Sequence, residues 1–142
     1  MSIMMKRGFT LIELLVVISI IGILIGLSIF GLQGARESSR DGKRKADLEQ
    51  IRSGLEIYKA DCNSYPATLG ITLVGNNSNP SCASGNTYIA SVPKDPIGTS
   101  YYYSSDGIIY QICARLEQTS TSPDICSGSC GGSACNYKVV NP

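Results

Sequence analysis

The sequence predicts an α+β fold in which one long N-terminal helix packs on a small antiparallel sheet. Three patterns indicate it: an apolar run over residues 9–32, an amphipathic stretch over 35–61, and a period-two apolar pattern over 108–116. The chain has 142 residues, which suits one modest domain rather than two. The absence of His and the balance of 12 Lys+Arg against 11 Asp+Glu argue against histidine-based catalysis and against dedicated nucleic-acid binding.

The apolar run over residues 9–32 carries a single charge, Glu13. A helix of this length measures about 36 Å, enough to cross a hydrocarbon core of roughly 30 Å. Lys6 and Arg7 precede the run, which places the N-terminus in the cytoplasm and the remainder on the exported side. Because the run is longer than the roughly 7–15 apolar residues of a secretory signal, we expect a membrane-spanning helix.

Glu13 is costly inside a bilayer, and no side chain of opposite charge lies within the apolar run. A simple signal anchor would leave this carboxylate unexplained. The stretch around it, Lys6-Arg7-Gly8-Phe9-Thr10-Leu11-Ile12-Glu13-Leu14-Leu15-Val16-Val17, resembles the class III signal of type IV pilins and type II secretion pseudopilins. The resemblance implies cleavage by a prepilin peptidase between Gly8 and Phe9, followed by N-methylation of Phe9. It also implies that Glu13 pairs with the amine of a neighbouring subunit and so sets the register of filament assembly.

The chain from residue 35 to 61 is predicted to continue as an amphipathic stem helix. Seven basic and five acidic residues lie between 36 and 59. Pro66 and the polar residues before it indicate the end of the helix. Four apolar positions repeat at helical spacing and predict the stripe that carries the head: Leu48, Ile51, Leu55 and Tyr58.

Residues 62–142 are predicted to form the head. A Tyr-rich strand over 100–104 and a strand over 108–116 flank a turn in which Gly107 tolerates a positive φ. Residues 137–140 are expected to add an edge strand. The predicted organisation therefore has four parts. They are a cleaved leader over 1–8, a membrane or filament-core helix over 9–34, the stem helix over 35–61 and the head over 62–142.

All six cysteines lie on the exported side, and an even number there predicts disulfides, with about 15 possible connectivities. We expect Cys62 to join Cys82 and the remaining four to tie Cys113 to the C-terminal loop. A zinc site is the alternative, weakened by the absence of His and of paired CxxC spacing. The candidates are Cys62, Cys82, Cys113, Cys126, Cys130 and Cys135.

Several head motifs resemble the major pseudopilin-like branch of the same family: Tyr65-Pro66, Pro93-Lys94-Asp95-Pro96, Tyr101-Tyr102-Tyr103, Asp106-Gly107 and Tyr110. That branch binds calcium in a C-terminal loop. Here only Asp124 follows Glu117 in that loop, so calcium is not carried over and no cofactor or metal is expected.

The resemblance implies a structural subunit that polymerises into a type IV pilus for adhesion, twitching motility or DNA uptake. The alternative is a pseudopilin of a type II secretion system. Either implies a subunit held in the inner membrane with its N-terminus inside, and the pilus interpretation then places it in an extracellular fibre. The implied partners are further copies of the chain, the prepilin peptidase, an inner-membrane assembly platform, a separate ATPase and membrane lipid, but no specific nucleic acid.

No catalytic constellation stands out. Without His, a Ser or Cys nucleophile would need a Lys base, and neither Lys94 nor Lys138 has a suggestive neighbour, so we expect a protein that is not an enzyme. The stem over 36–59 is net basic and the head is net acidic. This polarity suggests that basic stems lie against the acidic heads of neighbouring subunits.

Overall fold

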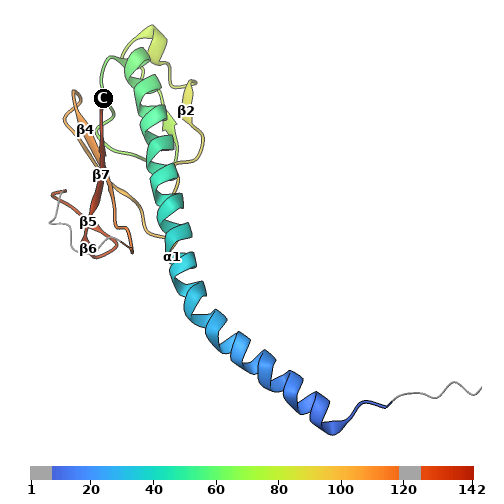
Figure 1. Ribbon diagram of the computed structural model, residues 1–142. Helices are drawn as coiled ribbons and strands as arrows, with labels where there is room; N and C mark the ends of the chain where they lie inside the picture. Colours follow the sequence, from blue (N-terminus) through green and yellow to red (C-terminus); the bar gives the residue numbers. More distant parts are fainter. Residues whose placement is uncertain (1–7, 119–125) are drawn as a thin grey trace, which may run out of the picture. The chain divides into compact units, whose positions relative to one another are not determined.

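A computed structural model describes residues 8–118 and 126–142 of the chain (Figure 1). Lys6, Arg7 and Asp124, on which parts of the sequence analysis depend, lie outside the described residues. The chain divides into two compact units, Met1–Arg36 and Glu37–Pro142. One helix, α1 (Leu11–Cys62), contributes to both units. The α+β fold predicted from the sequence is confirmed.

Helix α1 has recognisable signals at both ends. Thr10 precedes its first residue and bonds with Glu13. At the other end the Asn63 N–H donates to the Lys59 carbonyl at 2.9 Å, and Asn63 takes a φ of 60°. A left-handed residue directly after a helix is a common C-terminal cap, and Pro66 follows shortly afterwards. The helix therefore ends within a residue of the predicted position.

In the unit Met1–Arg36, the described side chains of the helix are all exposed. Ser19 and Ser28 donate their hydroxyls to the carbonyls of Leu15 and Leu24, at 2.7 and 2.8 Å. This bonding satisfies the two hydroxyl groups within an otherwise apolar stretch of helix. By length and composition alone, α1 is the one helix among the described residues that could cross a membrane.

The main sheet of the unit Glu37–Pro142 has the strand order β3-β4-β7 and is antiparallel throughout. The edge strand over 137–140 is confirmed as predicted. The central strand is shorter than predicted, because Ile108 and Ile109 belong to the turn, where the Asp106 carboxylate accepts both of their N–H groups at 2.9 Å. The three strands are β3 (Tyr102–Ser105), β4 (Tyr110–Ala114) and β7 (Tyr137–Val140).

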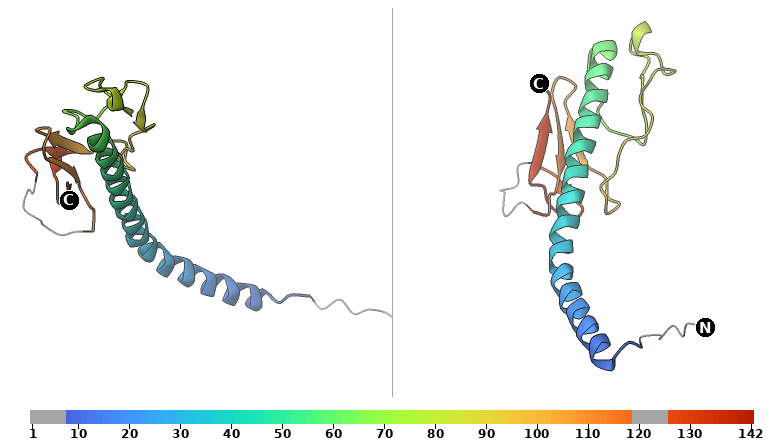
Figure 2. Two further views of the ribbon diagram at one scale, coloured as in Figure 1. Left: turned by 90° about the horizontal axis from the view of Figure 1, so that it is seen from above. Right: turned by 45° about the vertical axis from the view of Figure 1, so that its right-hand side comes forward.

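Two further strand pairs were not predicted, since each strand is only two or three residues long. Within the unit Glu37–Pro142, β1 and β2 lie on the side of α1 opposite β4 and β7 (Figures 1 and 2). A short 3-10 helix, η1 (Pro80–Cys82), lies between them in the chain. The pairs are β1 (Leu73–Val74) with β2 (Thr87–Ile89), and β5 (Ser129–Cys130) with β6 (Ser133–Ala134).

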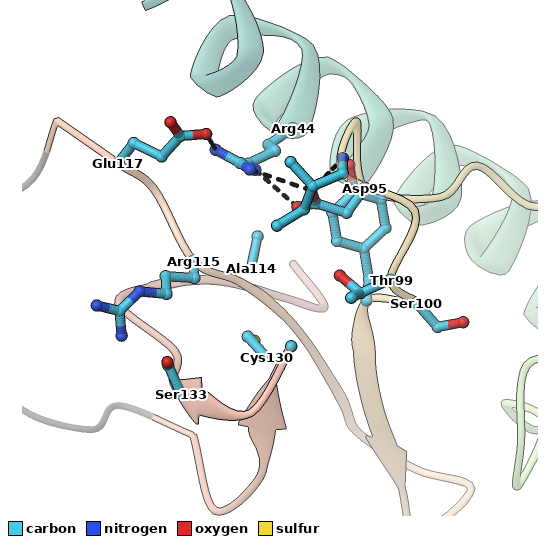
Figure 3. Close-up of a pocket in the computed structure, with 12 residues that line it drawn as sticks. Arg44, Asp95, Thr99, Ser100, Ala114, Arg115, Glu117, Cys130 and Ser133 are labelled. Carbon is cyan, nitrogen blue, oxygen red and sulfur yellow. Dashed lines mark hydrogen bonds and ion pairs between the residues drawn. The ribbon is translucent and has the colours of Figure 1, made fainter. Parts of the chain in front are cut away.

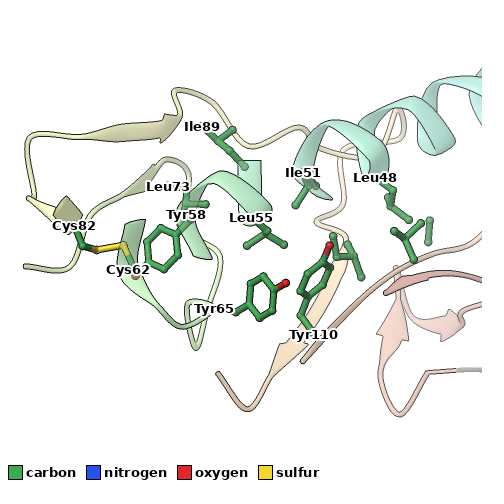
Figure 4. Packing of buried hydrophobic residues seen from close by; sticks show 13 residues of the cluster. Leu48, Ile51, Leu55, Tyr58, Cys62, Tyr65, Leu73, Cys82, Ile89 and Tyr110 are labelled. Atoms are coloured by element: carbon green, nitrogen blue, oxygen red, sulfur yellow. A yellow bond between two sulfur atoms is a disulfide. The ribbon is translucent and has the colours of Figure 1, made fainter. Parts of the chain in front are cut away.

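The core lies between α1, the sheet and the β1–β2 pair (Figure 4). The predicted stripe is confirmed, since Leu48, Ile51, Leu55 and Tyr58 are all buried. Ile112 and Val139 meet it from the sheet, and Ile89 meets it from β2. The β1–β2 pair approaches the helix closely at Gly54, where an added Cβ would lie 2.3 Å from the Cγ1 of Ile89. Glycine at this position therefore allows β2 to pack directly on the helix.

Candidate functional site

The start of α1 is organised by a capping box between Thr10 and Glu13. The Glu13 carboxylate accepts from the Thr10 hydroxyl at 2.9 Å and from the Thr10 N–H at 3.3 Å, and the Glu13 N–H donates back to the Thr10 hydroxyl at 3.3 Å. This reciprocal pattern satisfies two backbone groups that a helix start leaves unpaired. Thr10, three residues before Glu13, is a neutral partner for this carboxylate, and a search for opposite charges in the sequence does not find it.

The predicted processing site lies immediately before this box. Gly8 and Phe9 precede the helix, and the Phe9 side chain is exposed. Residues 8–10 are not helical, so the predicted bond between Gly8 and Phe9 lies outside the helix. Cleavage there would put a new amine on Phe9, one residue before the capping threonine.

A second candidate site is an ionic cluster around Arg44, whose side chain is buried although it carries a charge (Figure 3). Its Nε donates to Asp95 Oδ2 at 2.6 Å and its Nη2 donates to Asp95 Oδ1 at 3.0 Å. Its Nη1 donates to Asp41 and to Glu117, both at 2.7 Å. Arg44 thereby joins α1 to the loop before β3 and to the segment after β4. Buried charges are tolerated only with such complete pairing.

Asp41 completes the cluster from the helix, one turn before Arg44. Its carboxylate accepts from the backbone N–H of Glu117 at 2.9 and 3.0 Å and from that of Gln118 at 2.9 Å. Arg40 binds Glu117 from the same turn through a two-pronged ion pair. The segment after β4 is therefore fixed to α1 through both its backbone and its side chain.

These contacts shift the acidic pKa values downwards. Hydrogen bonding by Arg40, reinforced by Arg44 against a smaller effect of burial, lowers the pKa of Glu117 to about 2. Burial alone would raise the pKa of Asp41, but the N–H groups of Gln118 and Glu117 and the Arg44 guanidinium together hold it below its ordinary value. Burial would likewise raise the pKa of Asp95, but the Arg44 guanidinium outweighs it and lowers that pKa. The cluster is therefore fully ionised at neutral pH.

Backbone hydrogen bonds hold the loop that carries Asp95 in a conformation in which its carboxylate reaches Arg44. The Asp95 N–H donates to the Thr99 carbonyl at 2.9 Å, and Gly98, with a φ of 92°, donates to the Asp95 carbonyl at 2.7 Å. The Ile97 N–H donates to the Asp95 carboxylate at 3.0 Å. A cavity of about 270 Å³ lies beside this loop, with Arg44, Asp95 and Glu117 in its wall. The carboxylates there are already engaged, so the cluster acts as a structural clamp.

Charged residues of the stem and the head also pair within the chain. Arg40 and Arg44 of the stem bind Asp95 and Glu117 of the head. The expected contact between basic stems and the acidic heads of neighbouring subunits stays a prediction. The Asp41–Arg44 spacing of three residues on one helix face is a sequence signal that could have indicated part of the cluster.

The structure pairs the six cysteines as Cys62–Cys82, Cys113–Cys126 and Cys130–Cys135. The first is the pair expected from the sequence, and it ties the end of α1 to η1. The second ties β4 to the C-terminal loop, also as expected. Four of these residues form a second buried cluster, against which Tyr102 packs: Cys113, Cys126, Cys130 and Cys135.

The disulfide-bonded loop covers the outer face of the sheet opposite α1. Tyr102 and Cys113 are partners on neighbouring strands, so they lie on the same face, and both contact the loop. An added Cβ on Gly128 would lie 1.9 Å from the Tyr102 ring. The tyrosine therefore packs directly on the loop backbone, which gives the thin sheet a second covered face.

Comparison with known proteins matches two parts of the chain to described families. The model of the family described as type II secretion system (T2SS), protein G, matches residues 32–128, and the prokaryotic N-terminal methylation motif matches residues 3–29. The type II secretion system core protein G of Vibrio cholerae serotype O1 is 38% identical over 106 residues, covering 72% of this chain and 73% of the relative.

The identity and the coverage are similar for relatives from other genera. The core protein G of Pectobacterium carotovorum subsp. carotovorum is 36% identical over 72% of this chain and 69% of the relative. That of Pseudomonas aeruginosa is 33% identical over 72% of this chain and 75% of the relative. The comparison with solved structures found no significant match.

An N-terminal methylation motif, an exposed apolar helix and an α+β head together define a pilin-like protein. Within that class, the chain belongs to the type II secretion system protein G family. The resemblance seen in the sequence is thereby confirmed. The comparisons favour the pseudopilin alternative over the type IV pilus interpretation.

Proposed function

We propose that this chain is a pseudopilin of a type II secretion-like machinery, a structural subunit that polymerises rather than an enzyme. The observation that carries the proposal is the first unit of the structure. Its helix exposes apolar side chains on every side, and its only described carboxylate before Arg36 is the capped Glu13. Each such side chain gains about 1.5–3 kcal/mol on leaving water, so the helix belongs in lipid or among other helices.

A subunit of this kind would move from one of these environments to the other. Lipid holds the apolar helix before assembly, and a bundle of identical helices holds it afterwards. A prepilin peptidase would cut between Gly8 and Phe9, and methylation would follow on Phe9. The membrane platform and an ATPase would supply force. The relatives named type II secretion system core protein G support this proposal.

Glu13 would guide each incoming subunit. Its carboxylate is satisfied by Thr10 within one chain, so the amine of a neighbouring Phe9 would add a charged partner only on assembly. A pair of that kind fixes register more than it stabilises, because burying both charges costs nearly what their attraction gains. The head, fastened to the stem by the Arg44 clamp, would then be carried into the fibre as one body.

The test is the fate of the full chain in cells that contain its assembly machinery. We expect mass spectrometry to find a methylated N-terminus at Phe9. Chemical cross-linking with a reagent other than a carbodiimide should find multimers. Glu13→Ala should abolish multimers while leaving processing intact, and Glu37→Ala, which changes a carboxylate outside the apolar run, is the matched control. Wild-type multimer levels in Glu13→Ala would contradict the register role.

The two family alternatives separate in the same cells. A pseudopilin should remain with the cell envelope and should be needed for protein export. A type IV pilin should appear abundantly in the fraction sheared from the cell surface. Abundant sheared chain together with unaffected export would replace the pseudopilin proposal by the pilus.

A further inference from the structure

The turn between β3 and β4 presents two exposed aliphatic side chains. Ile108 is 74% exposed and Ile109 is 55% exposed, although both lie within the folded head. Asp106 lies beside them and is also exposed. We call residues 106–109 the hairpin knob. Two adjacent exposed isoleucines beside a charge give this turn a small apolar surface that a partner could cover.

The hairpin knob is held rigidly. The Asp106 carboxylate accepts from the N–H groups of Ile108 and Ile109, and the Asp106 N–H donates to the Ile109 carbonyl at 3.3 Å. Ser105 donates its hydroxyl to the Ile109 carbonyl at 3.0 Å and accepts from the Gly107 N–H at 3.0 Å. A surface ordered before binding loses little entropy on contact. The same N–H bonds lower the pKa of Asp106, which is therefore charged at neutral pH.

A complementary surface lies around the loops that flank the β1–β2 pair. A groove of about 240 Å³ is lined by two loops, together with Ile51 of α1 and the residues Ser100 and Tyr101 before β3. The Val92 N–H joins the two loops by donating to the Ile71 carbonyl at 2.8 Å. Its rim carries Lys94, which is exposed. We call this hollow the loop groove, and the residues that matter here are Leu69, Ile71, Val92, Pro93 and Lys94.

The two surfaces are complementary in charge. The hairpin knob carries two exposed isoleucines beside a carboxylate, and the loop groove has apolar residues in its wall beside an ammonium group. The hairpin knob joins strands of the main sheet, whereas the loop groove flanks the β1–β2 pair, which lies on the other side of α1 (Figure 2). Two different complementary patches on one molecule make a heterologous contact, the kind that generates helical filaments.

The geometry points to a contact between copies of this chain in which the hairpin knob of one head seats in the loop groove of the next. Ile108 or Ile109 enters the apolar hollow, and Asp106 of one copy pairs with Lys94 of the other. This inference rests on the proposed polymerisation and adds the head surfaces that would select a second copy. Heads would thereby contribute to register alongside the helices.

A zero-length cross-link tests the contact directly. Carbodiimide activates the Asp106 carboxylate, and Lys94 displaces it to form an amide, with the carbodiimide taking up the oxygen as a urea. Two full-length variants, Lys94→Gln and Asp106→Asn, are produced with the assembly machinery, separately and together. The Asp106→Asn variant keeps a side-chain oxygen that can cap the turn, and the Lys94→Gln variant keeps an extended side chain at the rim, so both heads should fold.

Among the variant samples, mass spectrometry of the multimers should find a Lys94–Asp106 amide only when both variants are present. In the mixture, Lys94 is present only on the Asp106→Asn copies and Asp106 only on the Lys94→Gln copies. An amide between these two residues therefore has to join two copies. Multimers without this amide in the mixture, or Lys94 joined to another protein instead, would overturn the inference while leaving the proposed function standing. Absence of multimers from the unaltered chain would overturn both.

A variant and a matched control test the apolar part of the contact. Ile108→Gln should lower the multimer yield about tenfold, because the lost burial of one isoleucine corresponds to at least a tenfold change in association. Ile97→Gln is the control, since Ile97 is 67% exposed on the same head but lies outside the hairpin knob. Equal yields from the two variants, with equal thermal unfolding of their heads, would contradict the seating of Ile108.

Discussion

Arg44 binds Asp95 through two parallel hydrogen bonds although the two residues lie 51 positions apart and both are buried. This two-pronged pair brings a loop of the head onto the stem helix. It lies next to the boundary at which the apolar unit of the chain ends. The same guanidinium also binds Asp41 and Glu117, so a single side chain connects three segments.

Removing Arg44 from the stem helix should strongly destabilise the folded unit Glu37–Pro142. Arg44→Met leaves Asp41 and Asp95 as buried, unpaired carboxylates, which typically costs about 3–5 kcal/mol. Denaturation of the full chain in detergent micelles, followed by the near-ultraviolet signal of its 8 tyrosines, measures this loss. Arg52→Met is the control, because Arg52 is only half-buried and its pair with Glu49 spans 3.6 Å. Equal losses in the two variants would contradict the clamp.

The head should lose stability in acid because of Glu117. Its folded pKa of about 2 lies below the ordinary value of 4.5, so the unfolded state binds more protons as the pH falls. The contribution is complete above about pH 4.5 and is lost as the pH falls towards 2. Glu117→Gln should make the decline shallower in urea titrations across this range. Glu49→Gln, at an exposed position of α1, is the matched control.

The disulfides should differ in what they contribute. Cys62–Cys82 closes a separation of 20 residues and Cys130–Cys135 one of only 5. Loop-closure entropy then predicts about 3 kcal/mol for the first pair and about 1 kcal/mol less for the second. Paired serine substitutions, compared by denaturant midpoint, measure the difference. A larger loss on removing Cys130–Cys135 would show that this bond acts chiefly by supporting the sulfur–Tyr102 cluster.

Two glycines of the same helix should respond oppositely to alanine. Gly54→Ala places a methyl group against Ile89 and should cost about 1–3 kcal/mol through overpacking. Gly42→Ala meets no atom within 4 Å and should stabilise the helix by up to about 1 kcal/mol. Thermal unfolding of the two variants decides this. Stabilisation by both would mean that β2 does not pack against Gly54.

The regular elements were predictable because each has a local pattern. The stripe of Leu48, Ile51, Leu55 and Tyr58 has helical spacing, and the hairpin has a turn residue at Gly107. The strands β1, β2, β5 and β6 escaped prediction because two or three residues cannot show a period. The start of β4 was misplaced since the Asp106 carboxylate, rather than a strand partner, takes the backbone of Ile108 and Ile109.

The sequence by itself determined the long apolar helix, the family resemblance through Gly8, Phe9 and Glu13, and the pairing of the cysteines as disulfides. These features depend on composition and on interactions between residues a few positions apart, so they can be read directly from the sequence. Only the tertiary structure decided that Arg44 pairs with Asp95 and Glu117 in its own chain. Charge counts carry no distance, so they cannot distinguish a pair within one subunit from a pair between two. Folding brings residues 44, 95 and 117 close together, so their charges pair within one subunit.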